Sequence, residues 1–211
     1  MQPECYSERD LKLMFGQVAR NDNDLSGIIE QYGYPPDWTR PNSFETLVLT
    51  ILEQQVSLAS AYAAYKKLKE RVPFIPAMVL KLSDEELKSC YVSRQKIIYI
   101  RQLADAIASD TINLKKFETQ PDDAVRTELK KLKGIGNWTV DIYLIHALRR
   151  KDIFPTGDLA LVNSIKMVLK KESINKKELL NISEQWKPYR SFATMLFWHY
   201  YIRKKGIRIL H

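Results

Sequence analysis

Apolar side chains recur along most of the chain at the three-to-four-residue spacing of helices that are buried on one side. The clearest stripe starts at Phe44 and returns three, four, seven and eight residues later, ending at Leu52. No stretch keeps the strict alternation typical of a half-buried strand. We therefore predict an all-α fold. With Ser57 and Ser83 as capping residues, the pattern predicts helices over residues 44–52, 57–68, 83–90, 97–104, 124–132, 137–148, 158–169 and 189–204.

The composition is that of a globular protein, because 45% of the 211 residues are hydrophobic and 27% are charged. This length suits one domain, or two small lobes that share a cleft. No apolar run approaches the ~20 residues of a membrane span, and the start of the chain, residues 1–4, lacks the layout of a signal peptide. Cys5 and Cys90 are too few for a four-thiolate zinc or iron–sulfur site. We expect a location in the cytoplasm of a bacterium or the nucleus of a eukaryote.

Positive charge is concentrated in the later part of the chain. The net charge is +8, yet residues 1–60 carry −5, so the remaining 151 residues carry +13. A basic body of this kind favours a polyanionic partner, with nucleic acid as the leading candidate. The alternative is a protein that is basic without binding nucleic acid.

Two of the seven glycines form a tight turn, Gly134-Ile135-Gly136, between two predicted helices. Such a turn exposes backbone N–H groups at the start of the second helix, where the helix dipole favours an anion. This arrangement predicts a clamp that grips a DNA phosphate without reading bases. An ordinary helical hairpin is the alternative. The nearby cationic side chains that favour the clamp are Lys130, Lys131 and Lys133.

Asp158 follows Pro155 and Gly157, two residues that interrupt helical structure, and it lies where the next helix is predicted to begin. An aspartate at this position commonly serves only as an N-cap. A carboxylate close to a phosphate clamp also suits the stabilisation of positive charge on a sugar during glycosidic bond cleavage. The two roles are compatible.

Four segments together resemble one known family. The hairpin Leu-Lys-Gly-Ile-Gly-Asn-Trp-Thr (132–139) and the segment Asp-Ile-Phe-Pro-x-x-Asp-Leu (152–159) are similar to the helix-hairpin-helix (HhH-GPD) DNA glycosylase superfamily, within it the 3-methyladenine DNA glycosylase II branch. Segments 44–57 and 186–193 agree, so the resemblance spans about residues 40–202.

The resemblance implies two helical lobes with a cleft between them and the hairpin at its mouth. We expect one lobe over residues 44–130, the hairpin over 125–148, and a second lobe built from 1–43 with 149–211. We expect no counterpart of the extra N-terminal β-domain of longer bacterial members, because residues 1–40 look too short and too helical to replace it.

The resemblance also implies roles for individual residues. Asp158 is the expected catalytic carboxylate, and Gln55 is the expected wedge that fills the space left by an extruded base. From pattern alone Gln55 could be a plain loop residue and the two tryptophans plain core residues. Ile142 occupies a position where relatives can carry an aromatic residue, so the sequence does not predict the shape of the pocket or the range of substrates. The remaining expected groups are phosphate contacts at Gly134, Gly136, Thr139 and Lys133, a base pocket with Trp138 and Trp198, and carbonyls of Lys130, Leu132 and Gly134 that can hold Na⁺ or K⁺.

The function implied is base excision repair by a monomer that acts on double-stranded DNA. We expect it to require no cofactor and to have no membrane partner. Bifunctional relatives carry a lysine where Trp138 stands, so we expect hydrolysis and no lyase step. Alkylated purines carry positive charge, leave without strong acid catalysis and are attracted to aromatic faces by ~0.5–2 kcal/mol. The substrates expected are 3-methyladenine and 7-methylguanine. The alternatives are a glycosylase for oxidised, mismatched or deaminated bases and a non-enzymatic DNA-binding module.

Overall fold

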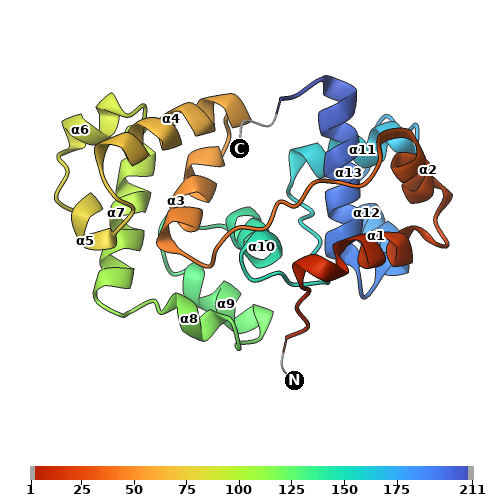
Figure 1. Ribbon diagram of the computed structural model, residues 1–211, viewed down its shortest axis with the longest axis horizontal. Helices are drawn as coiled ribbons and strands as arrows, with labels where there is room; N and C mark the ends of the chain where they lie inside the picture. The colour runs from red at the N-terminus through yellow and green to blue at the C-terminus, as the bar shows by residue number, and fades with distance from the viewer. Residues whose placement is uncertain (1–2, 209–211) are drawn as a thin grey trace. The chain divides into compact units, whose positions relative to one another are not determined.

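A computed structural model describes residues 3–208, apart from the side chain of Glu8. These residues form thirteen α-helices and no strand, and one isolated antiparallel bridge joins Cys5 to Arg150. The all-α prediction is confirmed (Figure 1). Among the described residues no helix has the length and apolar character needed to cross a membrane. The helices are α1 (Leu11–Ala19), α2 (Asn23–Tyr32), α3 (Phe44–Glu53), α4 (Leu58–Arg71), α5 (Pro76–Val79), α6 (Asp84–Ser89), α7 (Arg94–Ala108), α8 (Leu114–Phe117), α9 (Asp122–Leu129), α10 (Asn137–His146), α11 (Leu159–Val168), α12 (Lys176–Ser183) and α13 (Arg190–Lys205), with 3₁₀ turns at Glu8–Asp10 and Glu184–Trp186.

The chain divides into two compact units. The first holds residues 40–143, and the second combines residues 4–39 with residues 144–208. The boundaries fall at residues 39/40 and, within α10, at 143/144.

The first unit is organised around α3 and α7, which pack against each other. Helix α3 is buried along nearly its whole length, and its two buried threonines bond to carbonyls, Thr46 to that of Pro41 and Thr50 to that of Thr46. Burial on every side explains why this helix is rich in aliphatic residues and has no charged face. Helix α4 packs on α3, while α5 and α6 pack on α7 (Figure 1).

Helix α13 forms the centre of the second unit, where it contacts α1, α2 and α11. Its residues from Ser191 to His199 are all buried. Phe192 meets the rings of Tyr6 and Phe15 at centroid distances of 4.9 and 5.4 Å. The indole N–H of Trp186 donates to Asp22, the N-cap of α2, at 2.7 Å. Aromatic packing thus ties the first helices of the chain to its last one.

The sequence predicts the start of a helix best where a capping residue marks it. Ser57 caps α4, and Ser83 forms the expected capping box with Glu86 at α6. The predicted helix over 124–132 instead runs over Asp122–Leu129. No bounds were predicted for α1, α2 and α12. The single-turn helices α5 and α8 were not predicted either, because four residues are too few to show a helical period.

Candidate functional site

The Gly134–Gly136 turn joins α9 to α10, and its two glycines serve different purposes. Gly134 has φ +85°, and a Cβ there would lie 2.2 Å from the ring of Tyr99. Gly134 is therefore required for a left-handed backbone in close contact with α7. Gly136 is exposed, and no atom lies within 4 Å of where its Cβ would be. Ile135 is buried between them and anchors the turn.

Side chains from the first unit hold this turn from behind. The amide nitrogen of Gln54, Nε2, donates to the carbonyl of Gly134 and to Oγ1 of Thr139, each at 2.9 Å. The backbone N–H of Lys133 donates to Oε1 of Gln102 at 3.2 Å. Thr139 is only 2% exposed, so its side chain is structural, and only its backbone N–H suits a phosphate contact.

The outer side of the turn suits an anion. The first backbone N–H groups of α10 have no carbonyl acceptor within the helix, and the helix dipole adds positive potential there. The side chains of Lys130 and Lys133 are exposed beside them. Lys131 pairs with Glu128 at 2.8 Å on the surface, a contact of small energetic value. The outer side of the turn therefore has exposed backbone and cationic groups that are suited to an anion.

The carbonyls expected to hold a monovalent cation are partly engaged. That of Leu132 accepts from the N–H of Ile135 at 3.2 Å, and that of Gly134 accepts from Gln54 at 2.9 Å. Each carbonyl oxygen has two lone pairs, so a second interaction with Na⁺ or K⁺ is compatible with these bonds. The described residues contain no group of three or more His, Cys, Asp or Glu side chains placed to bind a metal.

Gln55 follows α3 with an exposed side chain and a backbone φ of +56°. A left-handed conformation costs a residue other than glycine about 1–2 kcal/mol. Strain of this kind is retained where surrounding structure or function requires it. Val56, the next residue, is 47% exposed and adds an apolar side chain to the same loop. The loop thus presents two side chains outward from the end of a buried helix.

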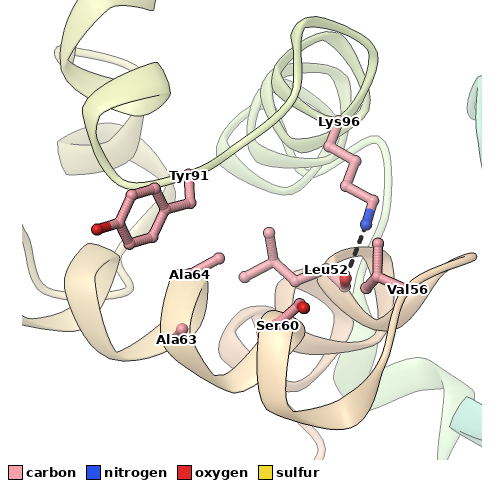
Figure 2. Close-up of a pocket in the computed structure, with 7 residues that line it drawn as sticks. All are labelled: Leu52, Val56, Ser60, Ala63, Ala64, Tyr91 and Lys96. Carbon is pink, nitrogen blue, oxygen red and sulfur yellow. Dashed lines mark hydrogen bonds between the residues drawn. The ribbon is translucent and has the colours of Figure 1, made fainter.

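A pocket of about 310 Å³ lies beside this loop, between the end of α3, the first turns of α4 and the start of α7. Figure 2 shows Tyr91 beside Ala63 and Ala64 of α4, and Lys96 extending from α7 to Leu52 at the end of α3. The amine of Lys96 donates to the carbonyl of Leu52 at 2.7 Å, and burial lowers the pKa of Lys96. Lys96 is therefore part of the pocket wall and not a solvated surface cation, whereas Arg94 is exposed. The remaining lining residues are Val56, Ser60, Ala63 and Ala64.

Asp158 lies in the second unit as the N-cap of α11. Its Oδ1 accepts from the backbone N–H of Leu161 at 2.7 Å and from the indole N–H of Trp198 at 2.9 Å. The residue is only 7% exposed. Two N–H donors stabilise the negative charge of the buried carboxylate and fix its orientation. Next to it, Leu159 leaves a large apolar side chain 77% exposed.

The ring of Trp198 is packed on more than one side. His146 stacks on it with centroids 5.4 Å apart and an interplanar angle of 21°. Trp38 meets it at 6.5 Å and 62°. Trp198 is 8% exposed, and its buried indole N–H finds its hydrogen-bond acceptor in Asp158. His146 is buried as well.

The expected site residues thus fall into two groups, each within one unit. The second unit brings Asp158 and Trp198 together. The first unit contains the other residues: Trp138 is half-buried at the start of α10 and Ile142 is buried further along the helix. Gln54, which joins the loop of Gln55 to the hairpin, was missed by sequence reasoning.

Comparison with known proteins identifies the family. The model of the HhH-GPD superfamily of base excision DNA repair proteins matches residues 48–188. The chain is 30% identical to a Bacillus subtilis DNA-3-methyladenine glycosylase over 75% of this chain and 57% of that protein. It is 28% identical to Schizosaccharomyces pombe DNA-3-methyladenine glycosylase 1 over 86% of each. The chain spans 57% and 64% of the length of the two Bacillus subtilis relatives.

The fold comparison agrees. The structure of Schizosaccharomyces pombe 3-methyladenine DNA glycosylase Mag1 in complex with abasic DNA superimposes with a TM-score of 0.82 at 25% identity, covering 88% of this chain and 95% of that one. The hairpin of Gly134 and Gly136 and the aspartate at Asp158 both fall inside the matched region, residues 48–188. The chain belongs to the HhH-GPD superfamily of base excision DNA repair proteins.

Proposed function

We propose that this protein is a monofunctional DNA glycosylase, of the 3-methyladenine DNA glycosylase II type, that hydrolyses the N-glycosidic bond of alkylated purines in double-stranded DNA. The observation that carries the proposal is Asp158, a buried carboxylate held by two N–H donors at the start of α11. The names of the relatives, DNA-3-methyladenine glycosylases, support the substrate class.

The chemistry requires a negative charge more than a proton donor. As the base leaves, the sugar develops oxocarbenium character, which a nearby fixed carboxylate stabilises. A purine alkylated at a ring nitrogen already carries positive charge and departs without protonation. The carboxylate of Asp158 would both face the developing cation and orient the attacking water.

The first unit would hold the DNA. The N–H groups of Gly136 and Thr139, with Lys133 beside them, would bind a backbone phosphate. Gln55 would enter the space left by the extruded base, whose removal from the stack costs a few kcal/mol. A Na⁺ or K⁺ on the carbonyls of Lys130, Leu132 and Gly134 would reinforce the clamp by its charge. In the second unit, Trp198 beside Asp158 would offer an aromatic face to the extruded base.

The test is a set of otherwise identical duplexes, each carrying one defined lesion. We expect release of 7-methylguanine and 3-methyladenine, with an intact abasic site as the product. Because Trp138 replaces the lysine that forms an imine in bifunctional relatives, sodium borohydride should trap no covalent protein–DNA adduct. Excision of 8-oxoguanine without excision of either methylated purine would refute the alkylpurine assignment, and a trapped adduct would refute the hydrolytic one.

A further inference from the structure

We propose that Gln54 is a positioning residue that couples the Gln55 loop to the Gly134–Gly136 hairpin, so that the wedge and the phosphate grip move as one body. The inference rests on the proposed function, because it assigns Gln54 a part in base extrusion. It goes beyond that function by naming a residue that need touch neither the base nor the reacting atoms.

The contacts of Gln54 make it a link between distant parts of the sequence. It ends α3 as the C-cap, directly before the strained residue Gln55. Both hydrogens of a primary amide can donate, and both are engaged here. One acceptor is the carbonyl of Gly134, 80 residues away, and the other is Oγ1 of Thr139, 85 residues away. One side chain therefore bonds both the turn and the first turn of α10.

Helix α7 contacts both the end of α3, before the Gln55 loop, and the Gly134–Gly136 hairpin. Lys96, Tyr99 and Gln102 are spaced three residues apart, so they lie along one side of the helix. Lys96 bonds the last turn of α3 at the carbonyl of Leu52. Tyr99 packs against Gly134, and Gln102 accepts from the N–H of Lys133.

The result is a closed set of contacts: α3 to α7, α7 to the hairpin, and the hairpin back to α3 through Gln54. A closed set leaves the Gln55 loop little freedom to shift relative to the hairpin. Displacement of a positioned group by about 1 Å can reduce a reaction rate by up to 10²-fold. If the wedge is held at a fixed distance from the phosphate grip, loss of Gln54 should impair extrusion while leaving the grip itself intact.

A double-mutant cycle tests this in the full chain. Gln54→Met keeps the length of the side chain and removes both donors, and Gln55→Ala removes the wedge. Each single variant should lower the single-turnover excision of 7-methylguanine about 10-fold. If Gln54 acts through Gln55, the double variant should fall within about twofold of Gln55→Ala alone. Affinity for a duplex with an abasic analogue should change less than about threefold in Gln54→Met, because the N–H groups of the hairpin remain.

Several controls keep the test decisive. Gln31→Met makes the same chemical change on an exposed face of α2 and should have no effect. If Gln54→Met folds poorly, Thr139→Val removes one of the two bonds and should give a smaller loss with the same dependence on Gln55. Multiplicative effects in the double variant would overturn the coupling. So would a loss of DNA affinity in Gln54→Met with an unchanged single-turnover rate.

Failure of the proposed function gives a different result. If the wild-type protein releases no methylated purine, the proposed function is wrong, whatever the variants do. Fluorescence of 2-aminopurine placed next to the lesion then reports extrusion without cleavage for the same four proteins. A signal that depends on Gln54 only when Gln55 is present would still support the coupling, and independent effects would still refute it.

Discussion

The two hairpin glycines offer a direct test of the geometry, because the structure predicts different effects of replacing them. Gly134→Ala should lower the stability of the fold, and Gly136→Ala should weaken DNA binding. In Gly134→Ala the new methyl group meets Tyr99 at 2.2 Å, and the residue keeps φ +85°. The left-handed backbone costs about 1–2 kcal/mol and overpacking a further 1–3 kcal/mol. Together these predict a loss of about 2–5 kcal/mol in the free energy of unfolding. For a chain of this size that corresponds to a fall in Tm of about 4–20 °C.

Gly136→Ala should behave in the reverse way. Nothing lies within 4 Å of its Cβ position and its φ is not in the left-handed region. Its Tm should therefore change by no more than about 2 °C, since surface substitutions of this kind stay within about 0.5 kcal/mol. The methyl group would instead obstruct the approach of a phosphate to the start of α10. We expect affinity for an abasic-analogue duplex to fall about 10-fold, equivalent to about 1.4 kcal/mol.

Thermal unfolding, monitored by circular dichroism, measures the change in Tm. Fluorescence anisotropy with a labelled duplex measures the change in DNA affinity separately. Tyr99→Ala provides the matched control, because it relieves the clash in Gly134→Ala but not the strain in φ. The double variant should be less destabilised than the sum of the single variants by about 1–3 kcal/mol. A Gly134→Ala protein with wild-type Tm would refute the close contact with α7. A Gly136→Ala protein with wild-type affinity would refute the phosphate approach.

Three further predictions concern the carboxylate and the wedge. Asp158→Asn retains an oxygen for the N–H of Leu161 but loses the charge, so single-turnover excision should fall about 10²–10³-fold with little change in Tm; wild-type excision would exclude a catalytic carboxylate. Trp198→Phe keeps a ring against His146 and removes the N–H donor to Asp158, so the excision rate should fall at least about 10-fold while abasic-duplex affinity stays within about threefold; an unchanged rate would leave Trp198 a packing residue. Gln55→Gly releases about 1–2 kcal/mol of left-handed backbone strain, which offsets the loss of about 0.4–1 kcal/mol through the added entropy of the unfolded chain. Its Tm should therefore not fall although its excision rate does, whereas Gln55→Ala keeps the strain. A clear drop in the Tm of Gln55→Gly would contradict the left-handed conformation of the loop.

The features predicted well from sequence are those set by neighbouring residues. Ser57, Ser83 and Asp158 were identified as helix starts because a cap depends on the next three residues only. The hairpin was located by its two glycines for the same reason. The apolar period predicted eight of the helices, but not α1, α2 or α12, and single-turn helices such as Pro76–Val79 left no period to detect.

The features missed depend on contacts across long stretches of sequence. The bonds of Gln54 reach acceptors 80 and 85 residues away, and the N–H of Trp198 reaches a carboxylate 40 residues away. Tyr99 behind Gly134 explains why this position needs glycine, yet nothing near residue 134 in sequence reveals it. Gln55 adopts φ +56° although glutamine is not typical of left-handed positions. In each case tertiary packing decides the contact.

The surroundings of Asp158 support the proposed enzymatic role beside its structural one. As a cap, an aspartate is no better than serine or asparagine, and one bond to the N–H of Leu161 would suffice. Burying a carboxylate costs free energy unless its charge is compensated, and a neutral capping residue would avoid that cost. Here the carboxylate is 7% exposed and is compensated by a second donor, the indole of Trp198, from another helix. A helix cap alone does not require this arrangement, whereas the proposed stabilisation of a sugar cation requires a carboxylate held in one orientation.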